Sequence, residues 1–192
     1  MSVTSIMIVG VGGQGTLLAS RILGSVFTAR GYDVKVSEVH GMSQRGGSVV
    51  TFVKYGEHVY SPVVDRGEAD YILAFERLEA ARWAGSLKKG GTLIVNDQRM
   101  DPMPVITGAA KYPEDIIERL KALGLDVVDV DALALAEEAG SPKAVNVVLI
   151  GVLSRLMPGV PVEAWHKAMT ETVKPKLLPI NEKAFELGRS AE

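Results

Sequence analysis

The sequence has no cysteine among its 192 residues. Disulfides, thiolate zinc sites, cysteine nucleophiles and iron–sulfur ligation by this chain are therefore excluded. Histidine is scarce as well, because only His40, His58 and His166 are present and they lack the spacing of metal ligands. We expect the chain itself to hold no metal.

Neither sign of charge dominates, since Lys and Arg number 21 and Asp and Glu 23, giving a formal net charge of −2. A nucleic-acid or anionic-membrane partner would favour a basic face, so neither is expected. Residues 1–4 lack the start of a signal peptide, and the most apolar stretch, 145–153, is too short to cross a bilayer. These features predict a cytoplasmic protein.

The first forty residues have the pattern of a β-α-β unit. The apolar run 5–9 predicts a strand covered on both faces, and it ends in a cluster of glycines. From Gln14, apolar residues recur every four positions and predict a helix that ends near Gly31. Alternation over 34–39 predicts a second strand, and the crossover helix implies that the two strands are parallel.

The rest of the chain continues the α/β pattern as one domain, residues 1–192. Segments 47–55 and 58–60, joined by a turn at Gly56 and Glu57, predict an inserted β-hairpin. Everything after Ala132 is expected to be helical. The predicted fold class is α/β: a Rossmann-like, doubly wound, mostly parallel sheet with an inserted β-hairpin and a helical C-terminal third. The other expected elements are strands at 71–75, 92–95 and 127–130, and helices through Arg82 and at 113–123.

A glycine-rich loop, residues 10–15, joins the first strand to the first helix. Its glycines at 10, 12 and 15 match the dinucleotide fingerprint, and the helix N-terminus favours an anion. An acid stands at the end of the second strand, where such domains bind ribose. Two interpretations stay open at this point: a nicotinamide or flavin nucleotide site, or glycines that only make the turn. The candidate residues are Gly10, Gly12, Gly13, Gln14, Gly15 and Glu38.

A second polar, glycine-rich loop, residues 40–47, follows the second strand. The carboxyl end of a strand faces the ligand crevice in an open α/β sheet, so this loop is expected beside the glycine loop. It suits an anionic ligand or a partner's surface, although Arg45 is equally explained as a surface cation. No nucleophile elbow or orienting acid is present, so no catalytic residue is predicted. The candidate residues are His40, Gly41, Ser43, Gln44, Arg45, Gly46 and Gly47.

Together these motifs resemble the γ-type domain of the pyruvate and other 2-oxoacid:ferredoxin oxidoreductases. The resemblance rests on the glycine loop, on the segment 37–47, on 70–76 with Glu79 and Ala80, and on 146–153 with 181–188. The long form of segment 37–47 most resembles the small (β) subunits of the indolepyruvate members. The resemblance covers essentially the whole chain.

The resemblance implies an accessory subunit of an oxidoreductase acting on the oxo group of an arylpyruvate or another 2-oxoacid. Such enzymes use thiamine diphosphate, magnesium and iron–sulfur clusters, reduce ferredoxin and form an acyl-CoA. The resemblance places these cofactors on a large catalytic (α) subunit, so this chain is expected to be inactive alone. The two loops would face CoA, the large subunit or both, and the isolated chain could form a homodimer. The chief alternative is an independent NAD(P)- or FAD-binding oxidoreductase, based on the fingerprint and Glu38, and a stand-alone binding or regulatory module is a third interpretation.

Several other residues are interpreted as structural. Asn181, Ala184, Phe185 and Gly188 share one helix face, which we expect to dock on the sheet of this domain. A buried Asn146 must find hydrogen-bond partners, and we expect it to cap a neighbouring backbone segment rather than face the crevice. Glu76 and Glu79, with arginines nearby, are expected on a solvated, charge-balanced face.

Overall fold

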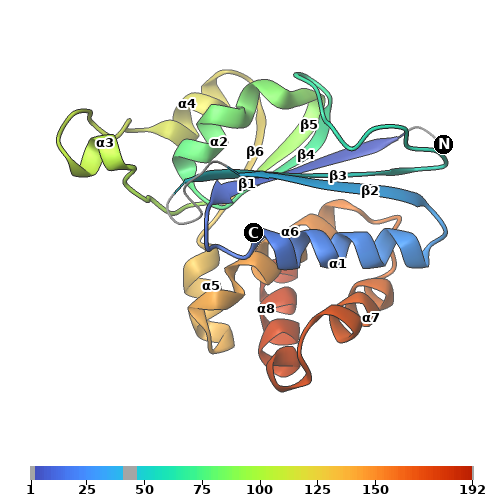
Figure 1. The fold of residues 1–192 in the computed structure, drawn as a ribbon. Helices are drawn as coiled ribbons and strands as arrows, with labels where there is room; N and C mark the ends of the chain where they lie inside the picture. The colour runs from blue at the N-terminus through green and yellow to red at the C-terminus, as the bar shows by residue number, and fades with distance from the viewer. Residues whose placement is uncertain (1–2, 41–46, 192) are drawn as a thin grey trace.

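The computed structural model describes residues 3–40 and 47–191 and contains a sheet with helices on both faces (Figure 1). One layer of helices comprises α1 (Thr16–Ala29), α5 (Ala132–Ala139), α6 (Val145–Leu156), α7 (Val162–Thr172) and α8 (Leu178–Ser190). The opposite face carries α2 (Arg77–Trp83) and α4 (Ile116–Ala122), while the short α3 (Met103–Ile106) projects away from both layers. The predicted Rossmann-like α/β fold is confirmed.

The sheet has six strands, five of which run in the same direction. Strands β1, β4, β5 and β6 form consecutive parallel pairs, and β3 is antiparallel to both of its neighbours, β2 and β1. From one edge to the other the order is β2 (Asp33–His40), β3 (Ser48–Gly56), β1 (Thr4–Val11), β4 (Ala69–Ala74), β5 (Leu87–Asn96) and β6 (Asp126–Val130).

Strand β1 lies inside the sheet and is buried on both faces, as its continuous apolar sequence predicts. Ile6 and Ile8 pack into the core beneath the α1 layer, whereas Met7 and Val9 pack into the core on the α2 side. All four side chains are fully buried. This double core fixes the end of β1, and therefore the position of the glycine loop that follows it.

The place of β3 corrects the predicted topology. Strands β1 and β2 do run in the same direction, but β3 lies between them and pairs with both. The predicted hairpin partner, residues 58–60, is not a strand. Because β1 and β2 occupy both edges of β3, no edge is left for that segment. It is held instead by a 2.9 Å hydrogen bond from the Val59 N–H to the Asp33 carboxylate.

The helical C-terminal third is confirmed, but α8 docks on α6 and not on the sheet. Gly188 of α8 lies so close to α6 that a Cβ there would stand 2.1 Å from the carbonyl oxygen of Val148. Gly151 of α6 likewise faces the backbone of Phe185. Small residues thus permit close backbone approach between two helices, a contact that helical periodicity alone could not assign to a partner. In the described ranges, no helix combines the length and apolar character that crossing a membrane requires.

Candidate functional site at the carboxyl edge of the sheet

The glycine loop needs glycine at several positions for steric reasons. Gly13 and Gly15 have φ angles of 103° and 87°, in the left-handed region that other residues rarely adopt. A Cβ at Gly10 would stand 2.7 Å from Oε1 of Gln14 and 3.0 Å from Cβ of Phe75. The sharp turn expected between β1 and α1 is therefore present.

Gln14 braces this loop from within. Its Oε1 accepts a 2.7 Å hydrogen bond from the Val11 N–H, and its Nε2 donates to the carbonyl oxygen of Phe75 at 3.2 Å. The Gly12 N–H donates to the Gly47 carbonyl at 2.9 Å. Two amide groups that a dinucleotide fingerprint would offer to a pyrophosphate are thus engaged by the protein itself.

The bond between Gly12 and Gly47 also joins the two predicted loops. Gly47 ends the second loop, so the expected neighbourhood of the loops is confirmed at this point. His40 is the exposed last residue of β2 and stands opposite Val49 of β3. The remaining predicted residues of the second loop lie outside the described residues: Gly41, Ser43, Gln44, Arg45 and Gly46.

Glu38 has a different environment from a ribose-binding acid. Its Oε2 accepts hydrogen bonds from the hydroxyl groups of Thr16 at 3.4 Å and Thr51 at 3.1 Å. Thr16 opens α1, so the carboxylate lies at the positive end of the helix dipole. Strand β3 also separates β2 from β1. A carboxylate that already occupies this position disfavours a second anion there, which argues against the dinucleotide interpretation.

Asn146, the second residue of α6, supports the glycine loop from behind. Its Nδ2 donates to the carbonyl oxygen of Gly15 at 3.1 Å, and its Oδ1 accepts from the Val147 N–H at 2.9 Å. The side chain is only 3% exposed. The expected capping of a neighbouring backbone segment is confirmed, and the segment is the glycine loop itself.

The structure contradicts the expected solvated face at Glu76 and Glu79, since both side chains are buried. Glu76 lies between β4 and α2, where its Oε2 accepts from the Glu79 N–H at 3.0 Å. Its Oε1 accepts from the Met100 N–H at 3.2 Å and from the Tyr112 hydroxyl. Burial, together with the hydrogen bond to Glu76, raises the pKa of Tyr112. The sequence did contain a signal for this buried site, namely an acid that follows closely after a buried strand, but the nearby arginines favoured a solvated face.

Glu79 completes a polar cluster beside the glycine loop. Its carboxylate pairs with Nε of Arg82 at 3.1 Å and accepts a hydrogen bond from the Ser48 hydroxyl. Glu76, Glu79, Ser48, Arg82 and Val11 line a cavity of about 190 Å³. Pockets for cofactors are commonly about 300–1,000 Å³, so this cavity alone does not hold one.

Comparison with known proteins assigns the chain to a family. The family described as pyruvate ferredoxin/flavodoxin oxidoreductase matches residues 5–191. The chain belongs to the pyruvate ferredoxin/flavodoxin oxidoreductase family. It is 44% identical to the indolepyruvate oxidoreductase subunit IorB of Thermococcus kodakarensis, an alignment that covers 97% of this chain and 95% of the relative.

Solved structures share the fold of this family member. Pyruvate oxidoreductase subunit PORC of Thermotoga maritima has a TM-score of 0.75 and 20% identity, covering 100% of this chain and 97% of that one. A second match is 2-oxoglutarate:ferredoxin oxidoreductase from Magnetococcus marinus, with a TM-score of 0.72 and 17% identity. This match covers 99% of the present chain but 31% of the Magnetococcus chain. The same fold therefore occurs both as a separate chain and as a segment of a longer one.

The residues of this family member do not suit the ligation of iron–sulfur clusters. Clusters require thiolates, and the sequence has no cysteine. Within 3–40 and 47–191, no group of three His, Asp or Glu side chains is placed to bind a metal ion. The carboxyl edge instead offers a braced glycine loop, a helix N-terminus and a buried carboxylate cluster.

Proposed function

We propose that the chain is the accessory small subunit of a cytoplasmic 2-oxoacid:ferredoxin oxidoreductase that oxidises indolepyruvate or another arylpyruvate to an acyl-CoA. The observation that carries this proposal is the 44% identity, over nearly the full length, to an indolepyruvate oxidoreductase subunit. The alternative of an independent NAD(P)- or FAD-dependent enzyme is disfavoured by the internal bonds of Gln14 and Glu38.

The composition supports a division of labour between subunits. With no cysteine in this chain, iron–sulfur clusters would be held by a large catalytic subunit. The Gly-Asp-Gly signature that helps hold magnesium diphosphate in thiamine enzymes is also absent from the sequence. Thiamine diphosphate, its magnesium ion and the transfer of electrons to ferredoxin would then belong to the partner. The isolated chain would be inactive and could self-associate through the surface meant for that partner.

The two loops are proposed to contact CoA, the large subunit or both. Because Glu38 already occupies the N-terminus of α1, the group proposed to meet a phosphate of CoA is Arg45 of the second loop, whose guanidinium suits that partner. Coenzyme A is bound in the Magnetococcus marinus enzyme, within whose chain the same fold occurs. The residues proposed to take part are those predicted from sequence in the two loops.

The first experiment is purification of the tagged chain from its native cells under anaerobic conditions. We expect a large iron-containing partner with bound thiamine diphosphate, and reduction of ferredoxin that requires both an arylpyruvate and CoA. A colourless chain that elutes alone and binds NAD(P) would overturn the proposal in favour of the independent oxidoreductase.

The role of the second loop is tested separately on the purified complex by isothermal titration with CoA. An Arg45→Ala complex is expected to bind CoA at least about tenfold more weakly, because charge-assisted bonds to phosphate are strong. Lys111→Ala removes an exposed charge outside both loops and serves as the control. Equal CoA affinity in the two variant complexes would show that Arg45 does not bind CoA, and the second loop would then be assigned a contact with the partner subunit alone.

A further inference from the structure

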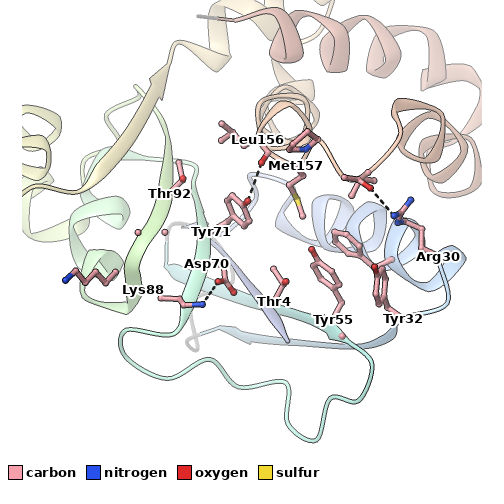
Figure 2. Close-up of a pocket in the computed structure, with 18 residues that line it drawn as sticks. Thr4, Arg30, Tyr32, Tyr55, Asp70, Tyr71, Lys88, Thr92, Leu156 and Met157 are labelled. Atoms are coloured by element: carbon pink, nitrogen blue, oxygen red, sulfur yellow. Dashed lines mark hydrogen bonds and ion pairs between the residues drawn. The ribbon is translucent and has the colours of Figure 1, made fainter. Parts of the chain in front are cut away.

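A pocket of about 670 Å³ lies at the amino ends of the strands, the edge opposite the glycine loop. It is lined by the first residues of β1 and β4, the last residues of β3 and the turn after α6 (Figure 2). We call it the amino-edge pocket. Its volume falls in the usual range of small-molecule sites, about 300–1,000 Å³.

Three of the five tyrosines in the chain, Tyr32, Tyr55 and Tyr71, line this pocket. Tyr55 stacks on the buried Phe27 and lies with its ring centroid 5.3 Å from that of Tyr32. The Tyr71 hydroxyl donates to the carbonyl oxygen of Leu156 at 3.3 Å. Burial raises the pKa values of Tyr55 and Tyr71, which favours the neutral phenols. Half-buried and fixed by packing, these rings form a wall suited to a planar ligand.

The same pocket has an excess of positive charge. Arg30, Lys88 and Lys89 line it, with Asp70 as the one carboxylate among its lining residues. Asp70 pairs with Nζ of Lys88 at 2.9 Å and accepts a bond from the Ser5 N–H. Within the part of the chain that the structure describes, Arg30 donates to a neutral group, the Gly159 carbonyl, at 3.0 Å. Two cations are thus left without a carboxylate partner among the lining residues, in a chain whose net charge is −2.

The lysines reach the pocket through an irregularity in the sheet. Pairing between β4 and β5 shifts register, so that Ala69 faces Leu87 but Tyr71 faces Thr92. Residues 88–91 therefore bulge out opposite Asp70. Gly90 has a φ of 80°, and a Cβ at Gly91 would stand 2.8 Å from the Asp70 carbonyl. An insertion of this kind changes the direction of the side chains that it carries.

We propose that the amino-edge pocket binds an aromatic anion: a planar ring lies against the tyrosine wall and its acidic group pairs with Arg30 or Lys89. Figure 2 shows Tyr55 and Tyr71 between Arg30 on one side and the Lys88–Asp70 pair on the other. The site is separate from the loops at the carboxyl edge and does not depend on the subunit role proposed above. Two ligand classes share this chemistry, an aromatic carboxylate and a nucleotide.

The test is titration of the full-length chain with indole-3-acetate and with AMP, followed by calorimetry and by NMR of the tyrosine rings. We expect at least one probe to bind with a dissociation constant of about 1 mM or below. Its uncharged counterpart, indole or adenosine, is expected to bind at least about tenfold more weakly. Binding of indole-3-acetate would identify the ligand class as an aromatic carboxylate, and binding of AMP would identify it as a nucleotide. No binding by either probe, or equal binding by the uncharged counterpart, would overturn the proposal.

Variants locate the site. At least one of Arg30→Gln and Lys89→Gln is expected to weaken binding of the probe by about tenfold, whereas the exposed Lys111→Gln, with the same change in charge, leaves the affinity unaltered. Lys89 is exposed and lies outside the core, so its replacement tests the pocket without threatening the fold. Equal affinity in the Lys89→Gln, Arg30→Gln and Lys111→Gln proteins would place the probe elsewhere and sink the proposal.

Discussion

The side-chain amide of Asn146 donates a 3.1 Å hydrogen bond to the carbonyl oxygen of Gly15, a residue 131 positions earlier in the sequence. The same oxygen accepts from the N–H groups of Leu18 and Ala19, which lie in the first turn of α1. One backbone carbonyl therefore joins the glycine loop, α1 and α6. The position of the glycine loop therefore depends on α6, a helix from the C-terminal third of the chain.

Gly15 is expected to tolerate no side chain. In Gly15→Ala the new Cβ would stand 2.6 Å from Nδ2 of Asn146, and the φ of 87° is strained for alanine. We expect the free energy of unfolding, measured in urea, to fall by about 1–3 kcal/mol. Gly24→Ala, in the interior of α1, is the matched control. A Cβ there would meet no atom beyond its own helical turn within 4 Å, so stability should rise by about 1 kcal/mol. Equal stability of the two variants would contradict the geometry.

Asn146→Ala is expected to lower the free energy of unfolding by about 1–3 kcal/mol, since it removes a buried hydrogen-bonding group. Amide hydrogen exchange is the sharper measurement, and it should accelerate at residues 16–19 of α1. Asn181→Ala serves as the control, because its amide donates to the carbonyl oxygen of Leu177, the residue just before its own helix, and not to the glycine loop. If both variants left exchange in α1 unchanged, Asn146 would not support the loop.

Glu76 is expected to hold the base of an arm, residues 99–111, which carries α3 (Figure 1). Its carboxylate accepts bonds from residues near both ends, the Met100 N–H and the Tyr112 hydroxyl, and from Glu79. In Glu76→Gln, an NH₂ group replaces one of the two accepting oxygens and faces N–H or O–H donors with which it cannot bond. We therefore expect the free energy of unfolding to fall by about 1.5–3 kcal/mol. Limited proteolysis should become faster within the arm, where Met103 and Ile106 are exposed.

The control for that experiment is Glu114→Gln, which neutralises an exposed acid close to the arm. It should leave both the stability and the rate of cleavage unchanged. If Glu76→Gln were cut at the same sites and rate as Glu114→Gln, the buried carboxylate would have no part in ordering the arm.

The buried Tyr112 is expected to make the stability of the protein fall at high pH. Burial and the bond to Glu76 raise its pKa above the ordinary value of 10.0, so the folded protein favours the neutral phenol. The associated stabilisation is complete below pH 10 and diminishes as the pH rises above it, because the unfolded chain ionises first. The difference in unfolding free energy between wild type and Tyr112→Phe should therefore shrink from pH 9 to pH 11. Tyr55 and Tyr71 remain in both proteins, so a constant difference would count against the Tyr112 assignment.

Much of the fold could be predicted from local patterns. The continuous apolar run of β1, the four-residue period of α1 and the glycines at 10 and 15 each depend on neighbours along the chain. The insertion of β3 between β1 and β2 could not be predicted in this way. Alternation shows that a segment is a strand, but it does not show which two strands it pairs with.

In the candidate site, too, contacts between residues far apart in the sequence could not be predicted from local patterns. Glu76 beside Arg77 has the local pattern of a solvated face, yet its hydrogen-bond partners Met100 and Tyr112 lie 24 and 36 residues away. Asn146 was correctly expected to cap a backbone segment, but nothing near it in sequence identifies Gly15 as that segment. Long-range partners decide whether a polar residue is buried, and a single sequence does not contain them.

For Gly188→Ala, helix propensity and packing predict opposite changes in stability. Alanine is the better helix former by about 1 kcal/mol, so propensity alone predicts that Gly188→Ala stabilises α8. A Cβ there would instead stand 2.1 Å from the carbonyl oxygen of Val148 on α6, a backbone atom that cannot rotate away. Separating the two helices would also uncover Phe185, which is fully buried. We therefore expect a loss of about 1–3 kcal/mol in urea unfolding, the range for an overpacked core. A gain in stability would show that α8 can move off α6 at little cost, and that the close approach of the two helices is not what holds the C-terminal layer together.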